Sequence, residues 1–328
     1  MAHLIQNKNV NGVFQDMLHR IAFSHNKAET RNGGVIQLDG PVIATYDHPW
    51  QRVLFSDLRD ANPFFHLMES MWMLTGRNDV DFPAHFVPRF KEYSDDGVTL
   101  AGAYGHRWRS HFEVDQVEFV IDELRHNPNS RRAVIAMWDP CADVTLVQHN
   151  GKDVPCNTTM TFQLRPNGGL EMSVFNRSND IIWGMCGANA VHMTVLQEYI
   201  AASLGVPMGP YHQISVNAHI YLNAQGTALL NDKPCDDRYS TRHLRHVSLF
   251  GSQASREEFD TDLLRFMADP FSDAAFQTQF FDGVVAPMMT AHLAYKDGDY
   301  ESALRATDYI VAWDWKIACA EWLQRRKK

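Results

Sequence analysis

The chain has 328 residues, 45% of them hydrophobic and 21% charged, and its formal net charge is −9. This length and apolar share suffice for a buried core, in one large domain or two smaller ones. The acidic balance excludes a general nucleic-acid coat, which needs a basic surface, but not a pocket in which a few arginines bind an anion.

The cysteine pattern and the N-terminal sequence indicate a cytoplasmic protein. Five cysteines, an odd number, occur without a CxxC pair in a chain far too long for a disulfide scaffold. The N-terminal segment has no apolar signal core, and no apolar run approaches the length of a membrane span. We therefore expect a reducing compartment, the cytoplasm of the cell or of an infected host cell, and no membrane partner.

The first half of the chain is expected to begin with an amphipathic helix over 10–26, a glycine turn at 30–34 and paired strands over 35–47. A strongly apolar helix follows over 62–75, where an Asn-Pro pair supplies the cap and the first turn. Another helix is predicted over roughly 114–126.

The second half alternates between strands and helices, and a turn at 167–169 joins two of the strands. Strands are predicted over 133–140, 159–166, 170–178 and 213–222. Helices are predicted over 188–204, 256–268 and 299–325. Without repeats or linkers, this order predicts one α+β domain over 1–328, with a large mixed sheet covered by helices and a divergent helical part at about 225–328.

Several residues are candidates for chemistry. Cys156 precedes a strand, where a lone cysteine is more often a small core residue, but nearby cations would lower its pKa and activate it. Glu69 lies inside the apolar helix and needs either a polar network or an acid–base role there. His219 and Tyr221 point to one face of a strand, as ligands or as a core pair. The arginines suited to phosphate, each of which is otherwise a surface residue, are Arg31, Arg131, Arg132 and Arg177, with Ser178 adding a hydroxyl.

Taken together, these residues resemble the thymidylate synthase family, including its pyrimidine hydroxymethylase branch. Seven motifs occur in the family's order between Arg31 and Tyr221, and although each alone is weak, the series is specific. They are Arg31 in the glycine turn, Glu69 with Trp72, Gly102-Ala103-Tyr104-Gly105 with Trp108-Arg109, Ser130-Arg131-Arg132 before Trp138, Pro155-Cys156, Asn176-Arg177-Ser178-Asn179-Asp180 with Gly184, and His219-Ile220-Tyr221.

The resemblance implies a role for each residue. Cys156 would add to carbon 6 of a pyrimidine nucleoside monophosphate, so that carbon 5 attacks 5,10-methylenetetrahydrofolate. Glu69 would organise water and proton transfer, and Tyr104 would assist removal of the carbon-5 proton. Asp180 would hold the folate ring, with Trp72 also at the folate site. The phosphate would be bound by Arg31, Arg177 and Ser178, joined by Arg131 and Arg132 from the second subunit of a sheet-to-sheet homodimer, and the sugar by His219 and Tyr221.

Three departures from the family pattern concern the base and its surroundings. Asn157 replaces the usual histidine after the nucleophile, and Asn176 replaces a glutamine. Counting from Asp180, the family's base-reading asparagine falls on Ala188, but one extra residue in the loop would bring Asn189 into place. An asparagine amide suits uracil, whereas an aspartate would suit cytosine. We therefore favour dUMP as substrate, with dCMP or CMP as alternatives.

A fourth departure concerns the product. The sequence ends in a basic, helical segment rather than the short apolar tail with which synthases close over folate. Water entering such a site would convert the exocyclic methylene on carbon 5 to hydroxymethyl, whereas hydride in a dry site would give methyl. The sequence thus favours a 5-hydroxymethyltransferase, with thymidylate synthase as the alternative.

Three other classes of protein are weaker interpretations. A non-catalytic nucleotide-binding protein on the same fold would not need Cys156, Glu69 and the arginines, yet all of them are present. A cysteine hydrolase would need a histidine paired with Cys156 within a family signature, which is not found. No histidine pair falls in a metal-ligand motif, so we expect no metal, and no nucleic acid is required.

Overall fold

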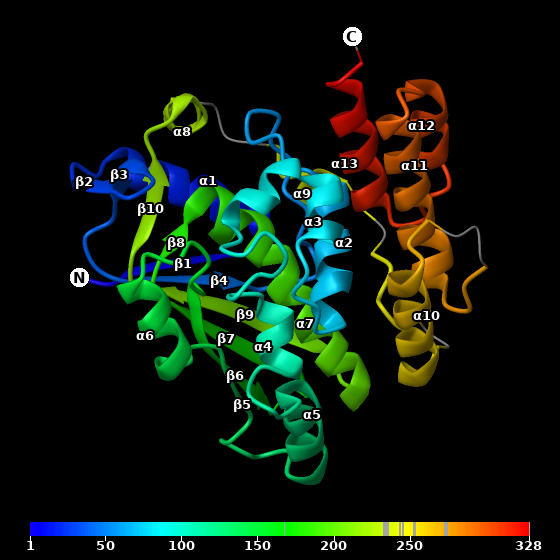
Figure 1. Cartoon of the computed structure of the whole chain (residues 1–328), viewed down its shortest axis with the longest axis horizontal. Helices are drawn as coiled ribbons and strands as arrows, with labels where there is room; N and C mark the ends of the chain where they lie inside the picture. The colour runs from blue at the N-terminus through cyan, green and yellow to red at the C-terminus, as the bar shows by residue number, and fades with distance from the viewer. Residues whose placement is uncertain are drawn as a thin grey trace.

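The protein is described by a computed structural model that covers residues 1–166, 168–231, 236–242, 244, 246–251, 254–271 and 275–327. The described strands form a six-stranded sheet, order β1-β4-β9-β7-β6-β5, and a four-stranded sheet, order β2-β3-β10-β8 (Figure 1). The strands are β1 (His3–Asn7), β2 (Lys27–Thr30), β3 (Gly33–Gln37), β4 (Val42–Tyr46), β5 (Val134–Ala136), β6 (Asn157–Leu164), β7 (Leu170–Asn176), β8 (Asn179–Asp180), β9 (Met208–Ser215) and β10 (Ala218–Tyr221).

Helices account for much of the remaining chain. They are α1 (Val10–Ala22), α2 (Pro63–Leu74), α3 (Asp81–Phe86), α4 (Tyr104–Arg109), α5 (Gln116–His126), α6 (Pro140–Gln148), α7 (Asn189–Leu204), α8 (Ala224–Leu230), α9 (Arg238–Thr241), α10 (Arg256–Ala268), α11 (Ala286–Lys296), α12 (Tyr300–Thr307) and α13 (Trp313–Gln324). A 3₁₀ helix spans Pro88–Tyr93, and π-helical segments span Ile181–Ala188 and Phe281–Val285.

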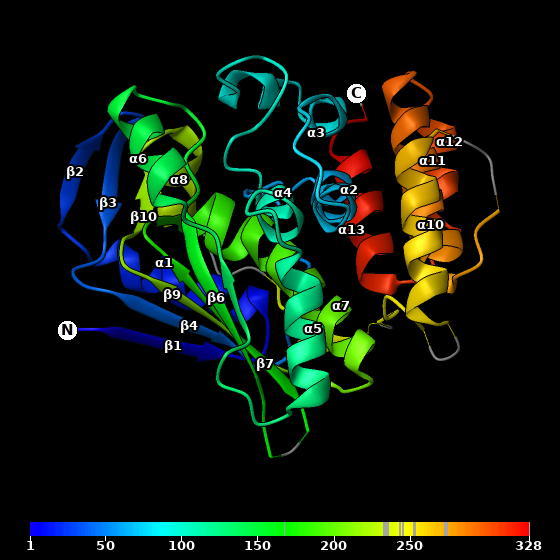
Figure 2. The ribbon, with the colours of Figure 1, turned by 60° about the horizontal axis from the view of Figure 1, so that its bottom comes forward.

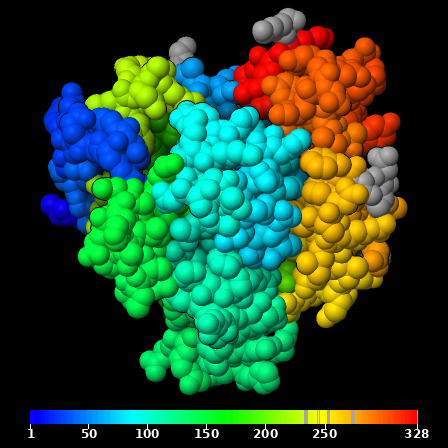
Figure 3. Space-filling model, viewed as in Figure 1, coloured from blue at the N-terminus to red at the C-terminus, as the bar shows by residue number. Residues whose placement is uncertain are grey.

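The helices are stacked outward from one face of the six-stranded sheet. Helix α7 packs on β7 and β9, α2 packs on α7, and α10, α11 and α13 pack on α2. Figure 2 shows this sequence of layers, with the sheet on one side and the C-terminal helices on the other. In Figure 3 the C-terminal helices, gold to red, form one flank of the surface.

Side chains alternate between the two faces of this sheet. The strand register places Met160 and Val174 side by side on the helix-covered face, and both are fully buried. It places Thr159, Phe175 and Ile214 together on the opposite face, where Phe175 is 38% exposed. One face of the sheet is therefore open in the single chain.

The α+β class is confirmed, but two sheets stand where one was expected. The strands predicted over 35–47 do not pair with each other, because β3 pairs with β2 and β10 whereas β4 pairs with β1 and β9. The chain crosses between the sheets at Gly40, where φ is 99°. Likewise, the strand predicted over 213–222 is split between β9 and β10. Local patterning identifies a strand, but its partner depends on distant segments.

Two other elements differ from the prediction in extent. The segment 133–140 is not a buried strand, since it contains only the short edge strand β5, in which Ile135 alone is buried. The helix predicted over 299–325 is two helices, α12 and α13, separated at 308–312. The hairpin β6–β7 is confirmed, although Asn167 of its predicted turn lies outside the described residues.

Candidate active site

Cys156 lies immediately before β6, half-buried, in a loop that two arginines hold. The backbone N–H of Arg177 donates to the carbonyl oxygen of Cys156 at 2.9 Å, and Nε of Arg177 donates to that of Pro155 at 2.9 Å. Nη1 of Arg31 donates to the carbonyl oxygen of Gly151, also at 2.9 Å. Arg177 and Arg31, both predicted phosphate ligands, are thus hydrogen-bonded to the segment 151–156 that carries the thiol.

Burial raises the pKa of the Cys156 thiol, and the positive charges of Arg177 and Arg31 offset this only in part. The two arginines therefore lower this pKa as expected, but in the chain by itself burial outweighs them and the net shift is upward. Burial, and then the charge of Cys156, likewise raises the pKa of the Tyr104 hydroxyl, which hydrogen-bonds to the backbone at Asn157. Tyr104 is consequently a neutral hydroxyl beside the thiol.

Glu69 on α2 faces a partner that the sequence analysis missed, His192 on α7. Nε2 of His192 lies 3.0 Å from Oε2 of Glu69, although the two groups are not aligned as a hydrogen bond. The side chains are only 4% and 10% exposed, respectively. His66 packs edge-on to His192, with the ring centroids 6.4 Å apart. His192 is one of several polar residues on α7, so no signal in the sequence singled it out.

Asp180 ends β8 and keeps one carboxylate oxygen without a partner. Its Oδ1 accepts hydrogen bonds from the backbone N–H groups of Ile182 at 2.7 Å and Trp183 at 2.6 Å. Its Oδ2 is buried and has no hydrogen-bond partner among the described residues. Burial raises the pKa of Asp180 to about 6. This geometry leaves an acceptor available for a ligand that brings N–H donors.

The tryptophan whose backbone is bonded to Asp180 is Trp183, and not the predicted Trp72. Trp72 is 2% exposed, and its Nε1–H donates to Asp79 at 3.1 Å, so its place at a folate site stays a prediction. Trp183 is 52% exposed, and the guanidinium of Arg59 lies 4.2 Å from the centre of its ring. Sequence reasoning missed both Trp183 and Arg59, because the cation–π pair joins distant segments.

Asn189 is the first residue of α7 and follows the π-helical segment. Gly187 has a non-helical backbone there, with φ −109° and ψ −117°, so the chain kinks just before the helix. Wide helical turns of this kind accommodate an extra residue and recur at functional sites. Nδ2 of Asn189 lies 3.4 Å from Oδ1 of Asn179. The wide turn before Asn189 therefore accommodates the one extra residue that this loop was predicted to contain.

His219 and Tyr221 share one face of β10, as predicted, with ring centroids 5.2 Å apart. Nδ1 of His219 is 2.8 Å from Oδ1 of Asn217, and the hydroxyl of Tyr221 is 3.5 Å from Nδ2 of Asn32, the neighbour of Arg31. β10 pairs with β8, which brings this face beside Asp180. Ser178, immediately before β8, is half-buried.

Arg131 and Arg132 are not brought to this cluster within the single chain. Both are exposed in the loop before the edge strand β5, and Nη2 of Arg132 is paired with Oε1 of Glu123 at 3.1 Å. The described contacts of these two arginines include none with Cys156 or Arg177. If they bind the phosphate, they must do so in another copy of the chain.

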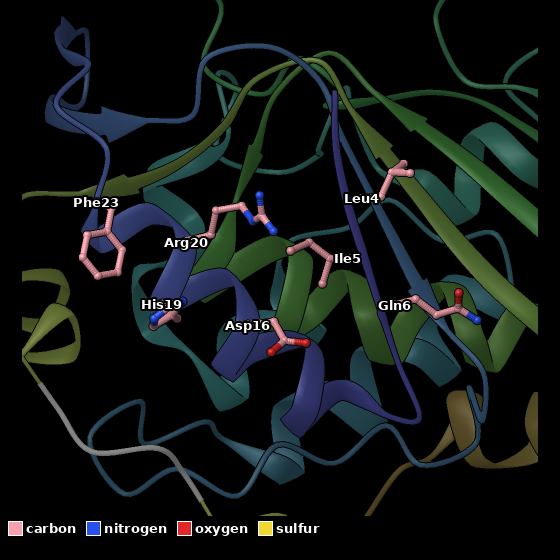
Figure 4. Close-up of a pocket in the computed structure, with 7 residues that line it drawn as sticks. All are labelled: Leu4, Ile5, Gln6, Asp16, His19, Arg20 and Phe23. Carbon is pink, nitrogen blue, oxygen red and sulfur yellow. The ribbon is translucent and has the colours of Figure 1, made fainter. Parts of the chain in front are cut away.

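Other features of the surface carry no predicted site residue. A cavity of about 520 Å³ lies between β1 and α1 (Figure 4). It is lined by Leu4, Ile5, Gln6, Asp16, His19, Arg20 and Phe23. Within the described ranges, no three His, Cys, Asp or Glu side chains are grouped as metal ligands would be. None of the described helices is both long and apolar enough to span a bilayer.

Fold and site together define the class of the protein, an α+β enzyme whose candidate nucleophile is a cysteine beside arginines. The sequence pattern of the family described as thymidylate synthase matches residues 13–283. A solved structure of thymidylate synthase from T4 phage aligns with a TM-score of 0.57 at 22% identity, covering 76% of this chain and 91% of that one. This likeness supports the fold alone.

Two relatives align over nearly their whole lengths. A deoxyuridylate hydroxymethyltransferase of Pseudomonas phage M6 is 42% identical over 337 residues, covering 99% of this chain and 94% of the relative. A protein of the same name from Delftia phage PhiW-14 is 28% identical over 329 residues, covering 93% and 91%. The chain belongs to the thymidylate synthase family, and the resemblance inferred from its motifs is confirmed.

Proposed function

We propose that the protein is a deoxyuridylate hydroxymethyltransferase, which converts dUMP, 5,10-methylenetetrahydrofolate and water to 5-hydroxymethyl-dUMP and tetrahydrofolate. One observation carries this proposal: the phage M6 protein of that name aligns with 99% of the chain at 42% identity. The compartment we propose is the cytoplasm of the cell or of an infected host cell.

In the proposed reaction, the thiolate of Cys156 forms a bond to carbon 6 while the electrons of the carbon 5–carbon 6 double bond move toward carbon 5. Arg177 and Arg31 favour the thiolate electrostatically, and we propose that they also bind the phosphate. Folate supplies the one-carbon unit that carbon 5 takes up. Tyr104, beside the thiol, assists removal of the proton from carbon 5. As that proton is removed, tetrahydrofolate leaves and an exocyclic methylene remains on carbon 5. Water adds to this methylene, and expulsion of the thiolate from carbon 6 then restores the ring double bond.

The Glu69–His192 pair is the proposed binding site for the water that adds to carbon 5's exocyclic methylene. A carboxylate and an imidazole 3.0 Å apart and almost fully buried can hold one water and accept its proton. We expect His192→Ala to retain dUMP affinity but to lose product formation, as measured by calorimetry and turnover. Equal loss of both would contradict this role.

Two features beside β8 support a site for the folate ring. The buried Oδ2 of Asp180 lacks a hydrogen-bond donor, and a pterin ring presents N–H groups on one edge. Trp183, held by Arg59 and 52% exposed, provides a flat surface next to it. We propose Asp180 and Trp183 as folate ligands, and Trp72 at the folate site stays a prediction.

A second copy of the chain is the proposed protein partner. The open face of the six-stranded sheet carries Phe175 and Ile214, and the exposed Arg131 and Arg132 lie next to its edge strand β5. Pairing of two such faces would bury the open side of the sheet and bring these arginines to the partner's phosphate site.

Incubation of the protein with methylenetetrahydrofolate and, in parallel, dUMP, dCMP or CMP tests the proposed function. We expect 5-hydroxymethyl-dUMP and tetrahydrofolate by mass spectrometry, with dUMP preferred. Thymidylate and dihydrofolate as products would instead establish the synthase alternative. If Cys156→Ala binds dUMP and the wild type turns over none of the nucleotides, the non-catalytic alternative holds.

A further inference from the structure

We infer that a buried hydrogen-bond relay through Gln213 and Asn179 fixes the amide orientation of Asn189 and thereby selects uracil over cytosine. The inference rests on the proposed function, because it assigns the base specificity of that same site. Gln213 and Asn179 act as positioning residues, since they reach the base only through Asn189.

The relay begins at a group whose hydrogen-bonding role is fixed. The carbonyl oxygen of Met185 can only accept, and the Gln213 amide approaches it at 2.7 Å, so the Gln213 atom there must be Nε2. The Tyr46 hydroxyl donates to the same carbonyl at 2.8 Å and lies 3.0 Å from Nε2 of Gln213. Gln213 is fully buried, so water does not offer its amide alternative partners.

The second step passes this orientation to Asn179. Oε1 of Gln213 can only accept, and it lies 2.7 Å from the Asn179 amide, whose atom there must be Nδ2. The same Nδ2 lies 3.1 Å from the hydroxyl oxygen of Ser215. Asn179 is 2% exposed. Its Oδ1 is therefore forced to point away from Gln213.

The third step fixes Asn189. Oδ1 of Asn179 accepts from Nδ2 of Asn189 at 3.4 Å. The approach depends on Gly184, where a Cβ atom would clash with Oδ1 of Asn179 and lie 3.1 Å from Nδ2 of Asn189. In the part of the chain that the structure describes, no donor bonds to Oδ1 of Asn189, which leaves this acceptor to a ligand.

This orientation matches uracil and opposes cytosine. Oδ1 of Asn189 can accept from N3–H of uracil, and the second hydrogen on Nδ2 can be donated to O4. Cytosine has an acceptor at N3 and a donor at carbon 4, so it requires the flipped amide. If the Asn189 amide alone flipped, its Oδ1 would face Oδ1 of Asn179. If the Asn179 and Gln213 amides flipped with it, Oε1 of Gln213 would face the carbonyl oxygen of Met185. Both arrangements oppose two acceptors, and the second does so at the fully buried Gln213.

Binding constants for dUMP and dCMP, measured by calorimetry on the full chain, test this relay. Gln213→Met removes the fixed amide but keeps the side-chain length, and Asn179→Ala frees Asn189 directly. In either variant we expect the preference for dUMP over dCMP to fall about tenfold or more. The matched control is Gln197→Met. Gln197 is fully buried, and its Nε2 donates to the carbonyl oxygens of Leu170 at 2.8 Å and Gly209 at 2.9 Å, outside the relay.

The control should lower the melting temperature and leave the dUMP-to-dCMP preference unchanged. The relay is overturned if Gln213→Met and Asn179→Ala keep the wild-type preference, or lose affinity for both nucleotides by the same factor. Thermal unfolding identifies any variant that does not fold, and the other variant then decides. Failure of the proposed function is a separate result, because it would appear as missing turnover of dUMP in the wild type whatever the binding preference.

Discussion

At the residue scale, the reactivity of Cys156 depends on competition between burial and charge. Burial raises the thiol pKa, whereas Arg177 and Arg31 lower it. The thiolate fraction at neutral pH is therefore smaller than that of a free cysteine, so in the proposed reaction the thiol loses its proton when it attacks the bound nucleotide.

We predict that iodoacetamide labels Cys156 slowly at neutral pH and faster as the pH rises past the ordinary thiol range. Arg177→Ala should slow labelling further, because it removes the larger of the two charges that lower the pKa. Peptide mass spectrometry separates Cys156 from the exposed Cys141, which is the internal control. Labelling that is already pH-independent at neutral pH would contradict this assignment.

Asp180 should make folate binding depend on pH. Burial raises its pKa to about 6, so the carboxyl is charged above that pH and protonated below it. A protonated oxygen no longer accepts freely from pterin N–H groups, so folate affinity should fall as the pH drops through about 6. Asp180→Asn should bind weakly at every pH tested. A wild-type affinity that rises toward pH 5 would contradict the role.

At the element scale, helix α4 is positioned by a buried ion pair. Nη2 of Arg107 lies 2.6 Å from Oδ1 of Asp143 on α6, with side chains only 1% and 0% exposed. Arg107 also donates to the carbonyl oxygens of Met137 at 2.7 Å and Ala101 at 2.8 Å. These bonds hold the helix that begins at Tyr104, and so they set the position of that hydroxyl relative to Cys156.

We expect Arg107→Ala to lower the free energy of unfolding by roughly 3–5 kcal/mol, because it leaves the Asp143 carboxylate buried without a counter-charge. Urea denaturation measures the change. The control is Arg305→Ala on α12, whose ion pair with Glu301 is exposed and should contribute less than about 1 kcal/mol. Similar losses in the two variants would show that the buried pair has no special role.

Local sequence signals predicted some elements and not others. The Asn-Pro start of α2 is as expected, since Asn62 accepts from the backbone N–H of Phe65. The motifs also identified Cys156 and Tyr104, which the fold places beside each other, and Asp180, which lies opposite His219 in the sheet. Strand partners and the Glu69–His192 pair could not be predicted, because each depends on contacts between distant segments that no local pattern records.

At the scale of the whole molecule, the apolar core and the open sheet face define how the chain is organised. One buried cluster includes both Ile5 and Leu323, which supports our proposal that residues 1–328 form a single domain with a helical C-terminal part. The open face supports the proposed sheet-to-sheet dimer, in which the arginines before β5 complete the phosphate site of the partner copy.

A charged residue on the open face of the sheet should both dissociate the proposed dimer and abolish turnover. We expect Ile214→Asp to sediment as a monomer and to lose activity, because Arg131 and Arg132 can no longer reach the second site. Leu264→Asp on α10, at a position that is 63% exposed and away from the sheet, should remain dimeric and active. A wild type that is fully active as a monomer would contradict the proposed assembly.

In the proposed reaction water, and not hydride, completes the conversion of dUMP that Cys156 begins. Turnover of dUMP with methylenetetrahydrofolate in water enriched in heavy oxygen tests this most directly, with the nucleotide product analysed by mass spectrometry. We expect 5-hydroxymethyl-dUMP that carries the heavy oxygen, formed together with tetrahydrofolate. Thymidylate without the label, formed together with dihydrofolate, would contradict it.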